Sequence, residues 1–565
     1  IYSNFVIDFM KLAFYCLTFS FLLSCTSANK SFFSKNDLKK SQKIIGLKFS
    51  KNYLDTLHPY LIRNRKGYDS MRLYSLNYQR FPSLQFNPHP IKFEIPKKVN
   101  GNSNYGDLIN LEIPQTMEDI AFYTIPQLNS LIRQRKITSL ELTQLYLKRL
   151  KEHDPTLFCV ITLTEKLALS QARRADSLLG AGVYLGPLHG IPYGLKDLFS
   201  VKGYPTTWGS APFKNQIIEE TATVAKRLED SGAVLVAKLV TGSLARGDVW
   251  FGGKTRNPWD PKQGASGSSA GPGSATAAGL VGFSIGTETL GSITSPSTRN
   301  GITGLRPTYG RVSRNGVMSL SWSMDKIGPM CRSAIGCAMV FEAIEGKDPL
   351  DQTSVDAPFL FNLKAKPKKY KVGYLKNLID MDSTDSGDNL RKALKTLKEN
   401  GINPIPIELP KNFPYNVFDI ILRAESGAFF DELVRSGGVD KMVQQHQKSR
   451  ANSLRQSRFI PAVEYLQANR FRGELIEQMN NLMNKFDVLI SPTFGGHQLM
   501  TSNLTGHPVV CVPTGFDNQN HPTSISFLGN LYEEDKILEF ANFFQTITNF
   551  HLKYPPLYFP SEEDD

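Results

Sequence analysis

Apolar side chains recur at helical spacing in two segments, residues 124–136 and 138–155. Each segment begins at a candidate N-cap threonine, Thr124 or Thr138, and Pro155 follows the last apolar position of the second. The apolar positions are Leu128, Leu131 and Ile132 in the first segment and Leu142, Leu145 and Leu150 in the second. We therefore predict two amphipathic helices at the start of the structured part of the chain, and we expect the second helix to end before the proline.

A different pattern follows, in which short, continuous apolar runs alternate with stretches of helical spacing. Such runs are typical of buried strands. They occupy residues 191–195, 233–239, 371–375, 487–493 and 508–516. Because strands that alternate with helices indicate a sheet covered by helices, the pattern predicts an α/β fold.

The start of the chain has the pattern of a secretory signal. We expect residues 1–9 to lie upstream of the true start at Met10, after which a lysine precedes an apolar run too short for a permanent membrane anchor. The run ends in Leu-Leu-Ser-Cys, which resembles a bacterial lipobox, so we expect a lipid on Cys25 and export to the periplasmic side of a bacterial membrane. An ordinary signal peptide that contains a cysteine is the alternative. Residues 26–116, rich in Lys, Asn, Ser and Tyr, predict an extended, partly ordered arm.

Composition limits the possible functions. The formal net charge is +13, and much of the positive charge lies between residues 30 and 100. No basic block is interleaved with aromatic residues, which argues against nucleic-acid binding, and a basic surface that faces an anionic membrane explains the charge better. The six cysteines and nine histidines are scattered, so neither a disulfide framework nor a metal site is predicted. With 41% hydrophobic residues, the chain can bury a large core.

One stretch, residues 264–301, combines many Gly, Ala, Ser and Thr residues with only two ionisable side chains, Glu288 and Arg299. Glycine allows a backbone to approach a substrate closely, and free backbone N–H groups can stabilise a developing negative charge. A hydroxyl there becomes a nucleophile only if a base removes its proton, yet no histidine lies in or near the stretch. Lys196 directly follows the apolar run 191–195, and burial lowers the pKa of a lysine, so Lys196 is the candidate base.

Several blocks of the sequence resemble the amidase signature family, whose members are serine hydrolases with a Ser–Ser–Lys triad. The blocks are GIPYGLKD, TRNPWD, GSSAG followed by IGTETLGSI, the run from GITGLRPTYGR to IGPMCRS, and GHPVVCVPTGF. They occur in the family's order, and the similarity extends from about residue 117 to 550. The resemblance implies a single large α/β domain over residues 117–555, with a mixed central β-sheet covered on both faces by helices.

The resemblance also implies roles for individual residues. Lys196 would be the base, Ser268 the middle serine after a cis peptide bond from Gly267, and Ser292, 24 positions further along, the nucleophile. Ser269 is a second candidate for the proton relay, although the spacing favours Ser268. No cofactor and no metal are implied. The oxyanion hole would consist of the backbone amides of Thr289, Leu290, Gly291 and Ser292.

The sequence departs from the family pattern around the nucleophile. The usual Gly-Gly pair is Leu290-Gly291, which keeps the amide donors but changes the pocket wall, and the usual Asp is Glu288. The arginine that the family usually has two residues after the nucleophile is replaced by Thr294. Arg299 is the candidate to take over the role of that arginine.

Three functions remain open. The first is an amidase that hydrolyses the carboxamide of a small-molecule substrate to a carboxylate plus ammonia or an amine, outside the cytoplasm and held at a membrane by the lipid on Cys25. The second is the glutaminase (A-type) subunit of a tRNA-dependent amidotransferase, which works in the cytosol with a partner, so that the export signal argues against it. The third, an inactive ligand-binding lipoprotein, is disfavoured because all three triad positions are filled. Monomer and homodimer are both compatible with the sequence.

Overall fold

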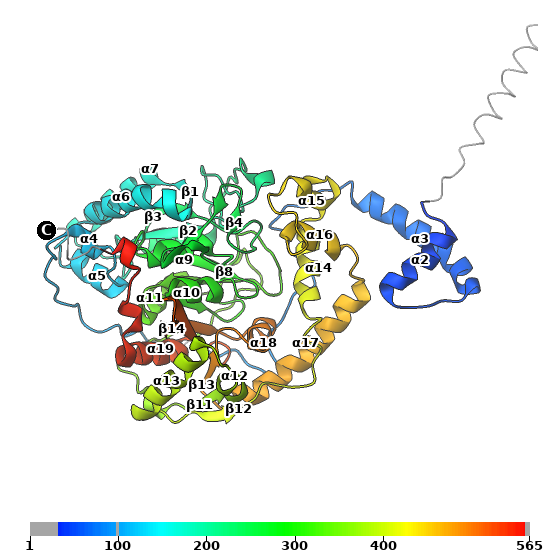
Figure 1. Ribbon diagram of the computed structural model, residues 1–565. Helices are drawn as coiled ribbons and strands as arrows, with labels where there is room; N and C mark the ends of the chain where they lie inside the picture. The colour runs from blue at the N-terminus through cyan, green and yellow to red at the C-terminus, as the bar shows by residue number, and fades with distance from the viewer. Residues whose placement is uncertain (1–31, 98–100, 560–565) are drawn as a thin grey trace, which may run out of the picture. The chain divides into compact units, whose positions relative to one another are not determined.

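The computed structural model describes residues 32–97 and 101–559. These residues form two compact units, one within Ile1–Asn77 and the other within Tyr78–Asp565 (Figure 1). The predicted signal sequence and lipobox, with Cys25, lie outside the described residues. In the part of the chain that is described, no helix is both long and apolar enough to cross a membrane.

The first unit contains two helices, α2 (Lys35–Ile45) and α3 (Lys51–Met71). Helix α2 begins at Ser34, whose hydroxyl accepts a hydrogen bond from the first turn, and it ends at Gly46 in the left-handed conformation. This unit differs from the extended arm predicted for residues 26–116. The segment contains an apolar stripe at helical spacing that its polar composition obscured. The stripe consists of Leu54, Leu57 and Leu61.

Within the described residues, the second unit contains fifteen strands. Their bounds are β1 (Val160–Leu163), β2 (Pro192–Lys196), β3 (Val234–Leu239), β4 (Val249–Trp250), β5 (Gly253–Lys254), β6 (Arg256–Asn257), β7 (Asp260–Gly264), β8 (Phe283–Glu288), β9 (Thr303–Arg306), β10 (Lys326–Cys331), β11 (Val372–Leu375), β12 (Ile405–Ile407), β13 (Val488–Pro492), β14 (Val509–Phe516) and β15 (Pro522–Leu528). Eleven of them form one sheet in the order β1–β3–β2–β8–β10–β9–β14–β15–β13–β11–β12. The sheet is mixed, because β2 is parallel to β3 and β8, and β11 to β12 and β13, whereas the other neighbours are antiparallel.

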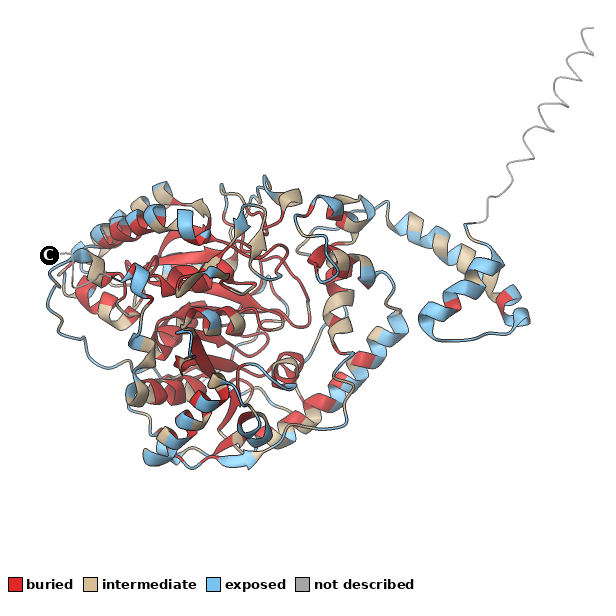
Figure 2. Ribbon diagram, in the orientation of Figure 1, coloured by how far each residue is buried: buried red, intermediate tan, exposed pale blue. Residues whose placement is uncertain are grey.

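Helices flank this sheet, and buried residues concentrate in the strands and in the helix faces that contact them (Figure 2). The second unit is therefore the single large α/β domain with a mixed central sheet that the sequence predicts. Its helices are α4 (Met117–Ile120), α5 (Ile125–Arg133), α6 (Ser139–Leu157), α7 (Glu165–Gly180), α8 (Thr223–Asp230), α9 (Ala270–Ala277), α10 (Thr294–Asn300), α11 (Ala334–Ile344), α12 (Lys376–Asp380), α13 (Asp385–Glu399), α14 (Asp419–Phe429), α15 (Asp431–Arg435), α16 (Arg450–Ser457), α17 (Ala462–Met483), α18 (Gln498–Thr505) and α19 (Glu534–Thr548).

The predicted elements agree closely with these bounds. All five apolar runs form strands, β2, β3, β11, β13 and β14, within one residue of the predicted limits, and the two amphipathic segments form α5 and α6. The end predicted for α6 is wrong, because Pro155 lies inside its last turn and the helix continues to Leu157. The missing N–H of this proline leaves only the carbonyl of Lys151 without its helical donor, and Lys151 is exposed to water.

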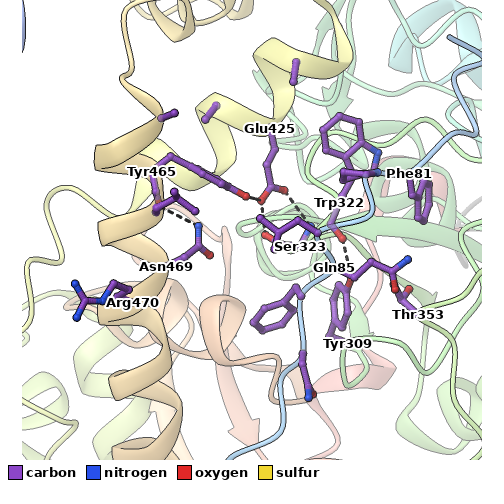
Figure 3. Close-up of a pocket in the computed structure, with 18 of the residues that line it drawn as sticks. Phe81, Gln85, Tyr309, Trp322, Ser323, Thr353, Glu425, Tyr465, Asn469 and Arg470 are labelled. Carbon is purple, nitrogen blue, oxygen red and sulfur yellow. Dashed lines mark hydrogen bonds between the residues drawn. The ribbon is translucent and has the colours of Figure 1, made fainter.

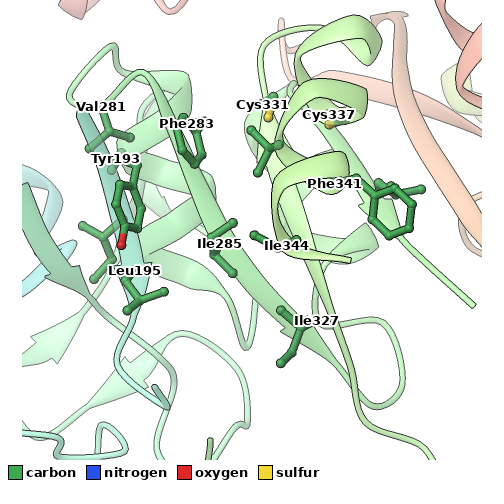
Figure 4. Close-up of a cluster of buried hydrophobic side chains, with 14 of the residues drawn as sticks. Tyr193, Leu195, Val281, Phe283, Ile285, Ile327, Cys331, Cys337, Phe341 and Ile344 are labelled. Atoms are coloured by element: carbon green, nitrogen blue, oxygen red, sulfur yellow. The ribbon is translucent and has the colours of Figure 1, made fainter. Parts of the chain in front are cut away.

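The core fixes strands β2 and β8 side by side. The rings of Tyr193 on β2 and Phe283 on β8 stack with their centroids 5.2 Å apart (Figure 4). The two strands are parallel neighbours, so their carboxyl ends meet at the same edge of the sheet. Lys196 is the last residue of β2 and Glu288 the last of β8, and the topology therefore places these two residues at the same edge of the sheet.

The segment 78–97 contains no helix and packs on the rest of the second unit. The Phe81 ring lies 4.9 Å from the guanidinium carbon of Arg314, and the Phe86 ring lies 3.4 Å from that of Arg472. The chain therefore divides after Asn77, earlier than residue 116, where the sequence analysis placed the end of the arm.

Candidate active site

Lys196 lies at the buried end of β2 and faces a serine. Its Nζ atom donates hydrogen bonds to Oγ of Ser268 at 2.9 Å and to Oγ1 of Thr287 at 2.8 Å. Burial lowers the pKa of Lys196 to about 7, against the nearby carboxylates of Asp325 and Glu288, which raise it. A large fraction of this lysine is therefore neutral at neutral pH and able to accept a proton. Thr287 was not identified from the sequence, because nothing in its spacing distinguishes it from other residues of a buried strand.

A second buried lysine on the neighbouring strand has a different environment. The Nζ atom of Lys238 lies 2.6 Å from Oδ1 of Asp197, and both side chains are completely buried. Asp197 also accepts hydrogen bonds from the backbone N–H and the hydroxyl of Thr207. Lys238 therefore neutralises a carboxylate, whereas Lys196 contacts hydroxyl groups, which makes Lys196 the better base of the two.

The loop between β7 and α9 presents Ser268 to Lys196. The peptide bond Gly267–Ser268 is cis, which confirms the geometry that the resemblance implies. A Cβ atom on Gly267 would lie 1.9 Å from the carbonyl oxygen of Gly247, so only glycine fits where these two loops meet. The Ser269 hydroxyl donates to the carbonyl oxygen of Thr287 at 3.2 Å, and Nζ of Lys196 contacts the same oxygen at 3.4 Å. This contact makes Ser269 a structural link to β8.

Ser292 lies in the turn between β8 and α10 and is 9% exposed. Its carbonyl oxygen accepts a hydrogen bond of 3.2 Å from Ser269 N, which holds the two serine-containing loops next to each other. Gly291 has φ +91°, a conformation that favours glycine. Among the described residues, the Ser292 hydroxyl makes no hydrogen bond to Ser268, so the second step of the relay stays a prediction. The same holds for the oxyanion role of the four amides in residues 289–292.

Glu288 organises the backbone that follows Ser292. One carboxylate oxygen accepts hydrogen bonds from the backbone N–H groups of Ile293 and Thr294, both at 2.9 Å. The other oxygen accepts one from Asn503 at 3.0 Å and lies 2.8 Å from Nη1 of Arg306. Burial alone would raise the pKa of Glu288, but Arg306 and these hydrogen bonds outweigh it and lower the pKa to about 2. Glu288 is therefore an anion that anchors the start of α10.

Arg299 does not take the role expected for it. Its guanidinium donates to Oε1 of Gln263 at 2.8 Å, in an exposed contact away from Glu288. The buried cation that pairs with Glu288 is Arg306, the last residue of β9. Arg306 stands in the block GLRPTYGR, and only the strand order that places β9 beside β10 and β14 brings it to this site. The expectation fails because a nearby position in sequence does not specify the direction of a side chain.

Another guanidinium lies beside the loop that contacts Ser268. Arg450, at the start of α16, is 4% exposed and donates hydrogen bonds to the carbonyl oxygens of Leu244 and Ala245 at 3.0 and 3.2 Å. Its remaining nitrogen, Nη1, has no hydrogen-bond partner among the described residues. Burial, with a smaller contribution from Arg246, lowers the pKa of Arg450 to about 9. The hydrogen-bond donors of this buried guanidinium are therefore only partly paired with acceptors among the described residues.

A cavity of about 800 Å³ lies in the same domain (Figure 3). Residues 81–87, helices α14 and α17, and Trp322 and Ser323 form its walls. The Glu425 carboxylate in this wall accepts hydrogen bonds from the hydroxyls of Ser323 and Tyr465, so it already has partners within the protein. None of the triad residues lines this cavity. In the described part of the chain, no cluster of three or more His, Cys, Asp or Glu side chains could hold a metal ion.

Comparisons with known proteins identify a family and several relatives. The family model described as Amidase matches residues 141–502. Over 482 residues the chain is 30% identical to the A-type subunit of glutamyl-tRNA(Gln) amidotransferase from Prochlorococcus marinus (strain NATL2A), a match that covers 76% of this chain and 99% of that protein. It is 33% identical to the protein of the same name from Marinomonas sp. (strain MWYL1), covering 77% of this chain and 98% of that protein. The solved structure of native peptide amidase from Stenotrophomonas maltophilia matches with a TM-score of 0.68 and 27% identity, covering 76% of this chain and 98% of that one.

Proposed function

The chain belongs to the amidase signature family, and on this basis we propose that it hydrolyses a carboxamide through an acyl-enzyme on Ser292. The observation that carries the proposal is the buried hydrogen bond of 2.9 Å between Nζ of Lys196 and Oγ of Ser268. A lysine with a pKa of about 7 that contacts a serine hydroxyl can remove a proton at neutral pH.

The reaction begins when neutral Lys196 takes the proton of Ser268 while Ser268 takes that of Ser292. The Ser292 oxygen bonds to the amide carbon, and the carbonyl electron pair moves to oxygen, where the amides of residues 289–292 stabilise it. Each such donor contributes about 3 kcal/mol to the transition state. The C–N bond then breaks as the leaving nitrogen takes a proton back through Ser268. Water next attacks the ester, loses its proton to the same relay and releases the carboxylate, and Ser292 regains its proton.

The sequence relatives favour the second candidate over an exported amidase. Proteins named as the A-type subunit of glutamyl-tRNA(Gln) amidotransferase match this chain along nearly their whole length. This similarity supports glutamine as the amide, with the released ammonia passed on in a complex with partner subunits. The matching peptide amidase structure supports the first candidate, a free-standing amidase.

The environment of Arg450 also supports an anionic substrate. The Arg450 guanidinium contacts Leu244 and Ala245, in the loop whose Gly242 N–H donates to the carbonyl oxygen of Ser268. A buried guanidinium with a free N–H at that loop would bind a carboxylate with charge-assisted hydrogen bonds. Glutamine carries such a carboxylate, whereas the carboxamide end of an amidated peptide does not. Arg450 therefore favours glutamine among the amides considered.

Ammonia release separates these candidates. Purified protein and the variant Ser292→Ala would be assayed with glutamine, an amidated peptide and an aryl amide. The glutamine assay would be repeated with the partner subunits of a tRNA-dependent amidotransferase and its glutamylated tRNA. Activity on glutamine that requires the partner subunits supports the amidotransferase function. Activity on the other amides without partner subunits supports the function of a free-standing amidase. If Ser292→Ala matched wild type on every amide, or neither protein released ammonia, the hydrolytic proposal would be rejected.

A further inference from the structure

One buried carboxylate joins two loops next to the nucleophile. Asp325 directly precedes β10 and is 8% exposed. Its Oδ1 atom accepts a hydrogen bond of 2.5 Å from the Thr289 hydroxyl, and its Oδ2 atom accepts 2.7 and 3.0 Å bonds from the backbone N–H groups of Leu320 and Ser321. Asp325 therefore connects residues 289–292 to the loop 318–325.

We propose that Asp325 is a positioning residue of the hydrolytic site. It holds Thr289 at the start of residues 289–292, the proposed oxyanion loop, and places a negative charge beside Lys196. This inference rests on the proposed function, since it concerns the residues assigned to it. Neither the sequence motifs nor the family match assigns a role to Asp325.

Two carboxylates hold the oxyanion loop from opposite ends. Glu288 binds the backbone N–H groups of Ile293 and Thr294 behind the nucleophile, and Asp325 binds the side chain of Thr289 ahead of it. Only residues 290–292 lie between these anchors. Because preorganised donors stabilise an oxyanion only when they point at it, losing either anchor would weaken catalysis.

The loop that carries Asp325 is itself fixed. The Ser321 hydroxyl donates to Oε2 of Glu425 at 2.6 Å, and Arg472 donates to the hydroxyl and the carbonyl oxygen of Ser323 at 2.9 and 2.8 Å. Phe86 stacks on the far side of the Arg472 guanidinium. These contacts hold the loop that carries Asp325 in place, and the hydrogen bond between Asp325 and Thr289 holds residue 289 against this loop.

Several charged groups surround this carboxylate and the lysine. Lys196 is influenced by two carboxylates, Asp325 and Glu288, and both raise its pKa. Glu288 already pairs with a buried arginine, whereas the other cations whose pKa values respond to Asp325 are Arg314, Arg450 and the adjacent, buried Lys326. Removing the charge of Asp325 lowers the pKa of Lys196, so its neutral form persists to lower pH.

The test measures how fast a fluorophosphonate labels Ser292, with loss of fluoride, as a function of pH. The probe needs only an activated serine, so the assay does not depend on knowing the amide substrate. Asp325→Asn removes the charge and leaves one acceptor oxygen for three donors. We expect labelling at pH 8 to slow by about 10- to 100-fold, since one oxyanion donor is worth at least that much. We also expect the midpoint of the acid limb to move to lower pH.

Two variants of Thr289 separate the positioning role of Asp325 from the effect of its charge. Thr289→Val removes the hydroxyl but keeps the charge of Asp325, so labelling slows by a similar factor and the midpoint of the acid limb stays in place. Thr289→Ser restores the hydroxyl, and its rate should return close to that of wild type. Asp348→Asn is the matched control, because Asp348 is 6% exposed and accepts hydrogen bonds from Thr223 and Ser313, away from the triad. It should lower thermal stability without moving the midpoint.

The outcomes distinguish the two proposals. If wild-type protein is not labelled at Ser292, the proposed function itself fails. If wild type is labelled and Asp325→Asn matches it in rate and midpoint, the role of Asp325 is overturned. A Thr289→Val protein with wild-type rate overturns the positioning part, and an Asp325→Asn midpoint equal to that of Asp348→Asn overturns the electrostatic part.

Discussion

The Nζ atom of Lys196 lies 2.9 Å from Oγ of Ser268, and neither side chain is more than 1% exposed. Burial lowers the pKa of this lysine, so much of it is unprotonated at neutral pH and can accept a proton, whereas a solvated lysine would stay protonated. The contrast with Lys238, which is equally buried but paired with Asp197, shows that burial alone does not decide the role of an interior lysine. The pH dependence of the reaction should therefore report Lys196.

The first prediction concerns that pH dependence. Lys196 accepts a proton only in its neutral form, which predominates above its pKa of about 7. The kcat/KM for amide hydrolysis should rise about tenfold per pH unit below pH 7 and level off above it. Steady-state rates between pH 5 and 10 check this expectation. A profile that falls through neutrality would contradict it, because activity would then need the protonated lysine.

Lys196→Arg should be as inactive as Lys196→Ala. A guanidinium keeps its proton at any working pH, so the longer cation cannot serve as a base. The control is Lys202→Arg, an exposed lysine in the loop after β2, which should keep full turnover. Rates for the three variants at pH 8 provide the measurement, and substantial turnover by Lys196→Arg would remove Lys196 from the mechanism.

Ser292→Ala should abolish turnover while leaving the fold intact. Loss of a serine nucleophile costs about 10⁴-fold or more in kcat. The Ser292 hydroxyl makes no hydrogen bond among the described residues, so the free energy of unfolding should change by less than about 0.5 kcal/mol. Turnover and urea unfolding of the same preparation test both parts. Residual kcat above about 1% of wild type would point to another nucleophile.

Arg306→Met should destabilise the domain strongly. The substitution removes the cation of a buried ion pair and leaves Glu288 without that partner. The free energy of unfolding should fall by about 3–5 kcal/mol. Arg299→Ala is the matched control, because its exposed contact with Gln263 should change stability by less than about 0.5 kcal/mol. Urea unfolding at pH 7 measures the effect of both variants; without Arg306, the pKa of the buried Glu288 rises. Equal effects of the two variants would show that Glu288 depends on Arg306 no more than on Arg299.

Parts of this molecule that rest on local pattern could be predicted from the sequence. Continuous apolar runs identified β2, β3, β11, β13 and β14, because strands buried on both faces need apolar residues at every position. The resemblance to the family's motifs identified Lys196 and Ser268, whose hydrogen bond the structure shows. The roles of Thr287, Asp325 and Arg306 could not be predicted, because each depends on which distant strand or loop lies beside it. The helical unit of residues 32–77 was missed because its apolar stripe is short and surrounded by polar residues.

The last prediction concerns location, which we propose from residues 10–25 alone. A lysine, a short apolar run and Leu-Leu-Ser-Cys predict cleavage before Cys25, lipid on that cysteine, and a catalytic domain outside the cytoplasm. Two or three acyl chains would hold the protein firmly at a bilayer, whereas one would not. After expression in a Gram-negative host, wild type should fractionate with membranes, and Cys25→Ala should be processed differently or become soluble. If both proteins stay in the cytosol with residues 10–25 attached, export is wrong, and the amidotransferase function that the sequence relatives favour becomes the better explanation.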